Sequence, residues 1–343
     1  MPHPPRAIMS ATIALVTAAV AATPAAAESV AEFYQGKTIS ILMGTQPGGS
    51  YDLYGRLIGE HLARRMPGHP TFIVEHMPGA GGVIAGNHIY GPAPQDGTKI
   101  LLSHSIPLAE KLEPKGVRFE STKFQWLGTY DAIAHTMAIW HGAQVGTLDQ
   151  LKPKSLVIGS FAKSHLTYQW AALMKSVLGT HFQVITGYRS GSDLNLAMER
   201  REVDGWAASW ENLAGTRPQW ITEKKVSVLV SFTLERKKQI PDVPTLLEVT
   251  PPDKKDLVEF VTAGTPFGRA MAVGPGVPAD RVAALRKAFD ETMKDPAFLA
   301  DAEKRHVDID PRPAAYAHSL AEKLAAASPE LVARVKQAIG QQE

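Results

Sequence analysis

The sequence predicts an α/β fold with two lobes and a ligand cleft between them. Short apolar runs alternate with amphipathic stretches, which is typical of parallel β-sheets covered by helices. This alternation is interrupted near Tyr130 and then resumes, and the proline-rich segment 241–252 is a candidate return crossing. With 343 residues the chain is long enough for two domains. We expect residues 28–130 and 252–343 to form lobe 1, and residues 131–251 to form lobe 2.

The composition is that of a globular protein with little net charge. The chain carries 36 basic and 34 acidic residues, a net charge of +2, and is 44% hydrophobic. These values exclude a disordered chain, a coiled coil and a collagen-like fibre, and the lack of a basic excess argues against a nucleic-acid partner. The absence of cysteine excludes disulfides, thiolate metal sites and cysteine nucleophiles.

The first 27 residues have the pattern of an export signal. Arg6 is their only charged residue, an apolar stretch runs from Ile8 to Ala22, and small residues follow at 25–27. The alternatives are a membrane anchor or a buried helix, but an apolar core of about 15 residues is short for a bilayer span. We expect cleavage near Ala27 and export of the remaining chain.

The first part of the remaining chain predicts a β-α-β-α-β unit. The strands are expected at 38–43, 71–75 and 99–103, one helix after Ser50 and running to about Arg65, and a short helix at 83–90. Ser50 is the expected N-cap of the first helix. Such a unit implies a parallel sheet with right-handed crossovers.

A second parallel αβ unit is expected after residue 130. The strands 126–130 and 136–140 follow each other without a helix, and this is where we place the first domain crossing. The elements that follow are strands at 156–159, 182–186, 205–209 and 226–232, and helices at 165–178 and 193–201, the second capped by Ser192. C-terminal helices are expected at 278–294, 314–327 and 329–339.

In open parallel sheets, ligands bind beyond the carboxyl ends of the strands. The candidate loops therefore follow Met43, Glu75, Ser103, Gly159 and Thr186.

The glycine-rich loop 44–50 is a candidate anion cradle. The backbone N–H groups from Gly48 to Tyr51 would lie at a helix N-terminus, which attracts anions. Ser50 stands where a nucleotide P-loop needs its lysine, so nucleotide binding is not favoured. A tight turn without a ligand remains an alternative. Asp52 suits either helix capping or ligand contact.

The loop 78–82 is a second glycine-rich loop in front of a helix. It departs from the dinucleotide fingerprint, because Ile84 stands where the third glycine belongs. Two such loops on neighbouring strands would together form a cradle for a small anion.

The second lobe offers polar loops at 160–167 and 188–192. Hydroxyl and N–H groups of the first loop could meet the far side of an anion, and Arg189 in the second could pair with a carboxylate or remain a solvated surface residue. Arg189 and Lys163 are the only basic residues that this interpretation places near the site.

Catalytic and metal-binding motifs are poorly supported. The 12 histidines form no HExxH motif, the chain has no GxSxG elbow, and Ser160, Ser164 and His165 share a loop without an oriented triad. We expect no catalytic residues, no metal and no cofactor, and hence a binding protein rather than an enzyme. The alternatives are an exported α/β hydrolase or esterase, and a ligand sensor for a membrane kinase.

An ordered set of short motifs resembles the solute-binding receptors of tripartite tricarboxylate transporters, the Bug family. The matching stretches are YQGK (34–37), PGGSYDLYGR (47–56), MPGAGG (77–82), PQDGT (94–98), TGYRSGSDLNLAMERREVDG (186–205), DVPT (242–245) and GVPADR (276–281). The chain departs from the usual family pattern at Gly55 and in the bulkier loop 159–164.

This resemblance implies a periplasmic, type II binding-protein fold and a carboxylate ligand held largely by main-chain groups and waters. It also implies membrane transporter subunits as partners, and we expect a monomer. From the loops and the resemblance together, the expected ligand contacts are Gln46, Pro47, Gly48, Gly49, Ser50, Tyr51, Asp52, Gly81, Gly82, Ser103, Ser160, Ser164, Tyr188 and Arg189.

Overall fold

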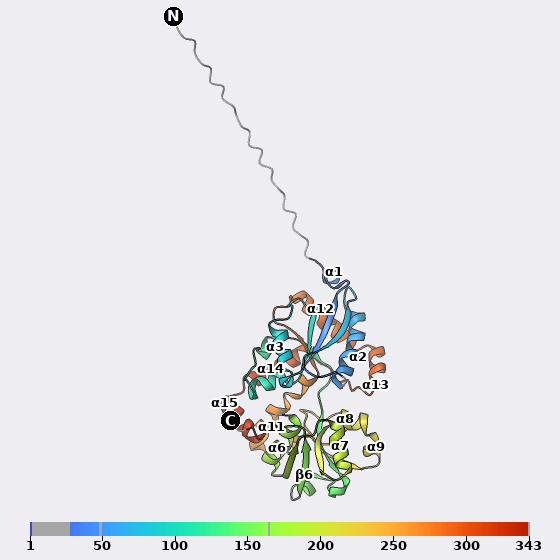
Figure 1. The fold of residues 1–343 in the computed structure, drawn as a ribbon, viewed down its shortest axis with the longest axis vertical. Coiled ribbons are helices and arrows are strands. Elements are labelled where there is room, and N and C mark those ends of the chain that lie inside the picture. Colours follow the sequence, from blue (N-terminus) through green and yellow to red (C-terminus); the bar gives the residue numbers. More distant parts are fainter. Residues whose placement is uncertain (2–27, 48–49, 164, 342–343) are drawn as a thin grey trace.

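The computed structural model describes residue 1 and residues 28–47, 50–163 and 165–341. Two sheets form the centres of two bodies, and the chain passes between these bodies (Figure 1). The strands are β1 (Thr38–Met43), β2 (Thr71–His76), β3 (Lys99–Leu102), β4 (Gln125–Thr129), β5 (His135–Trp140), β6 (Ser155–Ser160), β7 (His181–Thr186), β8 (Gly205–Ser209), β9 (Val226–Ser231), β10 (Ala270–Val273) and β11 (Arg312–Pro313).

The first sheet has the order β11-β4-β10-β3-β1-β2. β1 pairs in parallel with β2 and β3, so the predicted β-α-β-α-β unit is confirmed. β10 lies between β3 and β4 and is antiparallel to both. The sequence did not predict this strand, although it occupies the middle of the sheet.

The second sheet has the order β7-β6-β8-β5-β9. β6 pairs in parallel with β7 and β8, as the second αβ unit predicts. β5 is antiparallel to β8 and β9. In the first sheet the inner strands β4 and β10 are each antiparallel to both neighbours, and in the second sheet β5 is. Both sheets are therefore mixed.

Helices cover both faces of both sheets. They are α1 (Val30–Tyr34), α2 (Ser50–Arg65), α3 (Val83–Tyr90), α4 (Ile106–Leu112), α5 (Leu148–Leu151), α6 (Leu166–Leu178), α7 (Gly191–Glu199), α8 (Trp210–Thr216), α9 (Pro218–Thr222), α10 (Leu246–Val249), α11 (Lys255–Thr262), α12 (Ala279–Thr292), α13 (Pro296–Lys304), α14 (Ala314–Ala325) and α15 (Pro329–Ala338). α2, α12 and α13 share one apolar core with β1. α7, α8 and α9 share another with β8. A third core runs from α3, α4 and α14 to α6, α11 and α15, and so extends through both lobes.

The first turn of α7 differs from the prediction. Ser190, rather than Ser192, is the N-cap: its backbone is extended, and its hydroxyl accepts a hydrogen bond from the Asp193 N–H at 3.1 Å. Ser192 lies inside the helix, because the helix begins at Gly191. The difference arises because two serines flank a glycine, and sequence alone does not choose between them.

The crossings between the lobes meet in a buried cluster of charges. Asp131 follows β4 in the first crossing, and Lys237 follows β9 in the second. The Lys237 ammonium lies 3.2 Å from Asp131, 3.4 Å from Glu211 and 3.4 Å from Asp308. We name these four residues the hinge cluster. The three carboxylates lie close enough together to hold a metal ion, but the Lys237 ammonium already lies among them and supplies the positive charge.

In the described part of the chain, none of the helices combines the length and the apolar character that a membrane crossing requires. The predicted export signal falls on residues 2–27, which lie outside the described residues.

Candidate functional site

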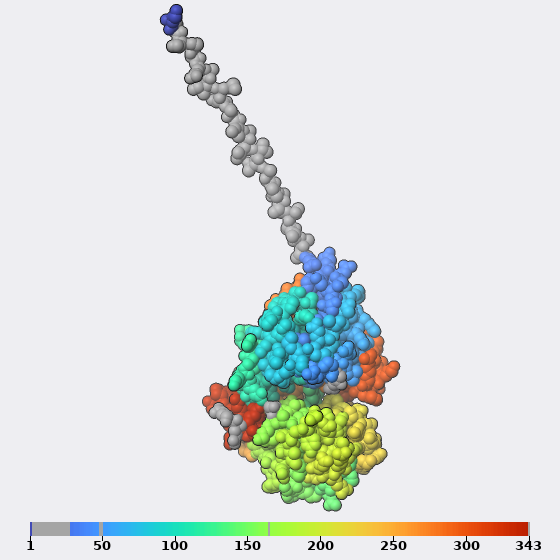
Figure 2. All heavy atoms as spheres, in the orientation of Figure 1, coloured from blue at the N-terminus to red at the C-terminus, as the bar shows by residue number. Residues whose placement is uncertain are grey.

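A cleft of about 550 Å³ lies between the two lobes, at the level where the blue and cyan surface meets the green and yellow surface in Figure 2. This volume is in the range of about 300–1,000 Å³ found for small-molecule sites. Lobe 1 contributes Thr45, Tyr51, Ala80, Gly81, His104, Ser105, Leu108, Ala109, Leu112, Glu113 and Arg269. The facing side contributes Ile133, His135, Phe161, Ala162, His165, Leu166, Gln169 and Ser209.

Arg269 is the main polar feature of this cleft. Its side chain is buried, and its guanidinium carbon lies 4.2 Å from the ring centre of Tyr54 and 4.6 Å from that of Tyr51. Its Nε and Nη1 have no hydrogen-bond partner among the described residues. Arginine keeps its charge in proteins, so the cleft contains a buried cation with two free donors.

The antiparallel strand β10 explains why Arg269 reaches the cleft. Parallel strands bring their carboxyl ends to the ligand edge of a sheet, whereas an antiparallel strand enters from that edge. Arg269 directly precedes β10, and the Ser103 N–H donates to the Ala270 carbonyl at 2.8 Å. The sequence prediction considered only loops that follow strands, and therefore it missed this residue.

His135 reaches the cleft in the same way, at the start of antiparallel β5 and paired with Ser209 at the end of β8. Burial, reinforced by the positive charges of His165 and Arg269, lowers its pKa to about 3. Burial, Arg269 and His165 likewise lower the pKa of His104 to about 4. Both rings are neutral at pH 7, and each has one buried nitrogen without a partner in the described chain. Neutral imidazoles can offer hydrogen bonds without adding charge.

Part of the predicted cradle lines the cleft. Tyr51 does so at the start of α2, with its ring stacked on His104 at a centroid distance of 4.1 Å. Gly81 also lines it, with φ +60 and open space where a Cβ would be. Gly82, at φ +95, packs against His104, and a Cβ on Gly44 would collide with the Gly82 backbone. The two predicted glycine loops therefore lie against each other.

Asp52 is held within its own lobe. Its carboxylate accepts hydrogen bonds from Arg56 at 3.0 Å and 3.1 Å, and it contacts His76 Nε2 at 3.0 Å. The Arg56 hydrogen bonds hold the pKa of Asp52 below its ordinary value. These contacts favour the helix-stabilising alternative over ligand contact.

In lobe 2 the loop before α6 is fixed by one threonine hydroxyl. Thr167 Oγ1 lies 2.8 Å from the Ser160 hydroxyl and accepts from the Phe161 N–H at 3.3 Å. His165 caps α6 by accepting the Thr167 N–H at 3.1 Å. Ser160 is thus buried in a structural network, and its neighbours Phe161 and Ala162 face the cleft instead.

The other predicted contacts are not among the described residues that line this cleft. Gln46 and Pro47 are exposed, and the Ser103 hydroxyl donates to the His104 carbonyl. Tyr188 is half-buried against the core of lobe 2, and Arg189 is exposed. Gly48, Gly49 and Ser164 lie outside the described residues, as does the side chain of Ser50. Their roles in ligand binding stay predictions.

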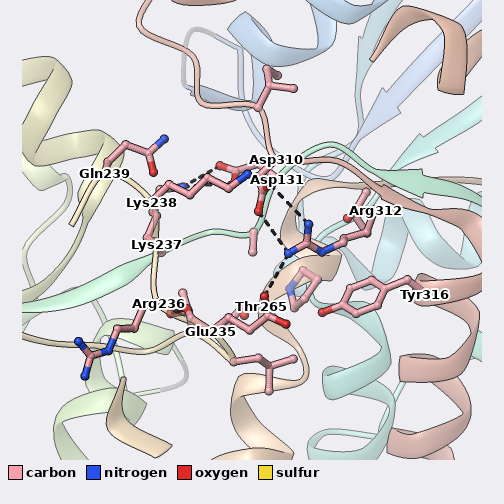
Figure 3. A pocket seen from close by; sticks show the side chains of 17 residues that line it. Asp131, Glu235, Arg236, Lys237, Lys238, Gln239, Thr265, Asp310, Arg312 and Tyr316 are labelled. Carbon is pink, nitrogen blue, oxygen red and sulfur yellow. Dashed lines mark hydrogen bonds and ion pairs between the residues drawn. The ribbon is translucent and has the colours of Figure 1, made fainter. Parts of the chain in front are cut away.

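A second, smaller pocket lies beside the crossings (Figure 3). Asp310 pairs there with Lys238 at 2.8 Å and with Arg312 at 3.4 Å, and Arg312 also pairs with Glu235 at 3.1 Å. The pocket measures about 80 Å³, which is well below the volume of small-molecule sites. We therefore take the interlobe cleft as the candidate site.

The fold and the position of the cleft define a class: two-lobed α/β proteins with a cleft between the lobes. No protein-family model matches the chain. In sequence it is 25% identical over 317 residues to the "UPF0065 protein in gbd 5'region" of Cupriavidus necator, covering 89% of this chain and 88% of that protein. It is 24% identical over 288 residues to a UPF0065 protein of Bordetella pertussis, covering 82% of this chain and 84% of that protein.

Solved structures have the same fold. A TctC solute-binding protein from Polaromonas superposes with a TM-score of 0.67 at 16% identity, over 90% of this chain and 100% of that one. An R. palustris protein with adipate gives 0.63 at 16% identity, over 89% and 97%. The periplasmic binding protein BugD gives 0.62 at 18% identity, over 89% and 98%. The predicted two-lobed binding-protein fold is confirmed, and so is the resemblance to tripartite tricarboxylate solute-binding proteins.

Proposed function

We propose that this protein is a periplasmic solute-binding protein that captures a small organic carboxylate in the interlobe cleft. One observation carries the proposal: the buried Arg269 guanidinium faces the cleft with two donors that lack partners in the described chain. The adipate bound to a structural neighbour supports the same class of ligand.

The physical argument is one of charge compensation. A buried charge is costly unless it is paired and hydrogen-bonded. Arg269 makes no ion pair within 4.0 Å among the described residues, and tyrosine faces cover part of its guanidinium. A carboxylate can accept two parallel hydrogen bonds from a guanidinium, and such charge-assisted bonds are about twice as strong as neutral ones. The ligand would thus supply the charge that the cleft lacks.

Capture would be coupled to delivery through the two crossings. A ligand that contacts both lobes stabilises the closed arrangement over the open one, which shifts the population between them. We propose that membrane transporter subunits distinguish the closed, loaded form. Loss of the protein should then abolish uptake of the ligand, whereas a sensor would change gene induction and leave uptake intact.

The proposal is tested by replacing the cation while keeping a side chain of similar length. Arg269→Met should weaken binding of the best carboxylate at least a hundredfold in calorimetric titration, because losing one partner of a buried pair costs about 3–5 kcal/mol. The ligand-free variant should be as stable as the parent or more so, since an uncompensated buried charge has been removed. Arg189→Met is the matched control on an exposed arginine, with an expected loss of no more than about tenfold.

Unchanged binding by Arg269→Met would contradict this role and return the site to the main-chain cradle expected from the sequence. The hydrolase alternative needs a serine oriented by a base. In the described lobe 2 loop, however, the Ser160 hydroxyl pairs with Thr167, and His165 caps α6. The geometry therefore favours binding. Turnover of simple esters by the purified protein would contradict it.

A further inference from the structure

The cleft has one charged end and an apolar middle. Arg269, His104 and Ser105 gather where β3 ends and β10 begins. Arg269 is the only lysine or arginine that lines the cleft within the described chain. A ligand therefore meets one cation at this end.

Helix α4 leads away from that end. Ser105 precedes it and Glu113 follows it, a separation of about 12 Å along a helix axis. Between them Leu108, Ala109 and Leu112 line the cleft. Phe161 and Leu166 line it from lobe 2. The body of a ligand that extends from Arg269 would pass between apolar side chains of both lobes.

The far end of this path is acidic. Glu113 is exposed at the end of α4 and is the only carboxylate among the described lining residues. A second carboxylate on an extended ligand would lie among apolar side chains or beside Glu113. Among the apolar side chains it would lose hydration without gaining a cation from the described lining, and beside Glu113 it would meet a like charge, so both positions are unfavourable.

We infer that the ligand is a monocarboxylate with an apolar body, rather than a di- or tricarboxylate. This inference rests on the proposed function and narrows it to a ligand class. One carboxylate would pair with Arg269, and the hydrocarbon part would be buried along α4 and the start of α6.

Hexanoate and adipate form a matched test, because they share a carbon skeleton and differ in the second carboxylate. Calorimetric titration of the full protein at pH 7 should show hexanoate binding at least tenfold tighter than adipate. Affinity should also rise about fourfold for each added methylene from butanoate to hexanoate, as expected for apolar burial. Adipate binding as tightly as hexanoate, or tighter, would overturn the ligand class but leave the proposed function standing. If none of these acids binds, nor any member of a wider carboxylate panel, the proposed function itself fails.

A charge change at the far end tests the geometry. Glu113→Lys replaces the acidic end of the lining by a cation on a long side chain that can extend back along α4, so the preference for hexanoate over adipate should shrink at least tenfold. Glu120→Lys makes the same charge change at an exposed residue that is not part of the lining. An equal shift in both variants would mean that long-range charge, rather than the local end of α4, sets the preference, and would overturn the inference.

Lys163 offers a second way to test the same point. It is exposed next to Ala162 and does not line the cleft in this structure. If the parent prefers adipate and Lys163→Gln removes that preference, lobe 2 supplies a second cation to the bound ligand. That result would also overturn the monocarboxylate assignment.

Discussion

At the scale of single residues, the cleft contains buried polar groups that have no hydrogen-bond partner in the described chain. The donors of Arg269 and one nitrogen each of His104 and His135 have no partner among the described residues. Buried polar groups normally have partners, so such a concentration supports the proposal that a ligand binds here. The histidines of the cleft add a consequence for acid stability.

We expect the free energy of unfolding to fall as the pH drops from 6.5 to 5. Burial lowers the pKa of His104 and of His165 to about 4 and that of His135 to about 3, so the unfolded chain binds three protons in this window that the native protein does not. Burial raises the pKa of Asp131 to about 7, so in this window the native protein binds one proton that the unfolded chain does not. This opposes the effect of the histidines. Each group contributes about 1.36 kcal/mol per pH unit, so a net fall of roughly twice that size per pH unit is expected.

Urea unfolding at pH 7, 6 and 5 measures this slope. His135→Leu removes one of the three imidazoles and should reduce the slope by about half, because one of the two remaining histidines is then balanced by Asp131. A parent protein whose stability is flat or rises on acidification would contradict the assignment of these histidines as neutral in the native state.

At the scale of elements, the loop that forms the lobe 2 wall of the cleft depends on Thr167. Thr167→Val keeps the shape but removes the partner of the buried Ser160 hydroxyl and of the Phe161 N–H. Leaving buried groups unpaired should reduce the free energy of unfolding by about 1–3 kcal/mol in chemical denaturation. Thr222→Val, on an exposed threonine of α9, is the control and should stay within about 0.5 kcal/mol of the parent. Equal losses in the two variants would show that the Thr167 hydrogen bonds contribute no more to the free energy of unfolding than an exposed threonine does.

Much of the element order was predictable, because hydrophobic periodicity reflects burial. The strand 38–43 was predicted with the bounds that the structure shows. The first helix was predicted to follow an N-cap at Ser50, but it begins one residue earlier, so Ser50 is its first residue. β10 was missed because Ala270–Val273 is short, made partly of small residues and flanked by glycines and prolines. Its antiparallel direction depends on where the chain returns, which no local pattern records. Arg269 was missed with it, and so the charged end of the cleft was not predictable from the loops alone.

At the scale of the whole molecule, the hinge cluster links the lobes. Asp131 and Lys237 lie in the two crossings, Glu211 is in α8 of lobe 2, and Asp308 lies between α13 and β11 of lobe 1. Burial lowers the pKa of Lys237, but the three carboxylates raise it by more, so the net shift is upward and the lysine stays charged. The cluster therefore holds both crossings and both lobes at one point.

Lys237→Met should destabilise the protein by about 3–5 kcal/mol, because it leaves buried carboxylates without their cation. Thermal and urea unfolding would measure the loss. Lys238→Met is the neighbouring control: its side chain is 79% exposed and pairs with Asp310, so its loss should cost about 0–1 kcal/mol. A Lys237 variant as stable as the Lys238 variant would show that the crossings do not depend on this cluster.

The place of β10 also affects the order in which the chain can fold. β3 and β4 are close in sequence, but they do not pair with each other, because β10 separates them. The sheet of lobe 1 cannot be completed until residues 270–273 have been synthesised, after every strand of lobe 2. Pairings over such long sequence separations form slowly. The nascent chain should thus remain without a finished first lobe for most of its synthesis, which favours an unfolded state during any passage through a narrow translocation pore.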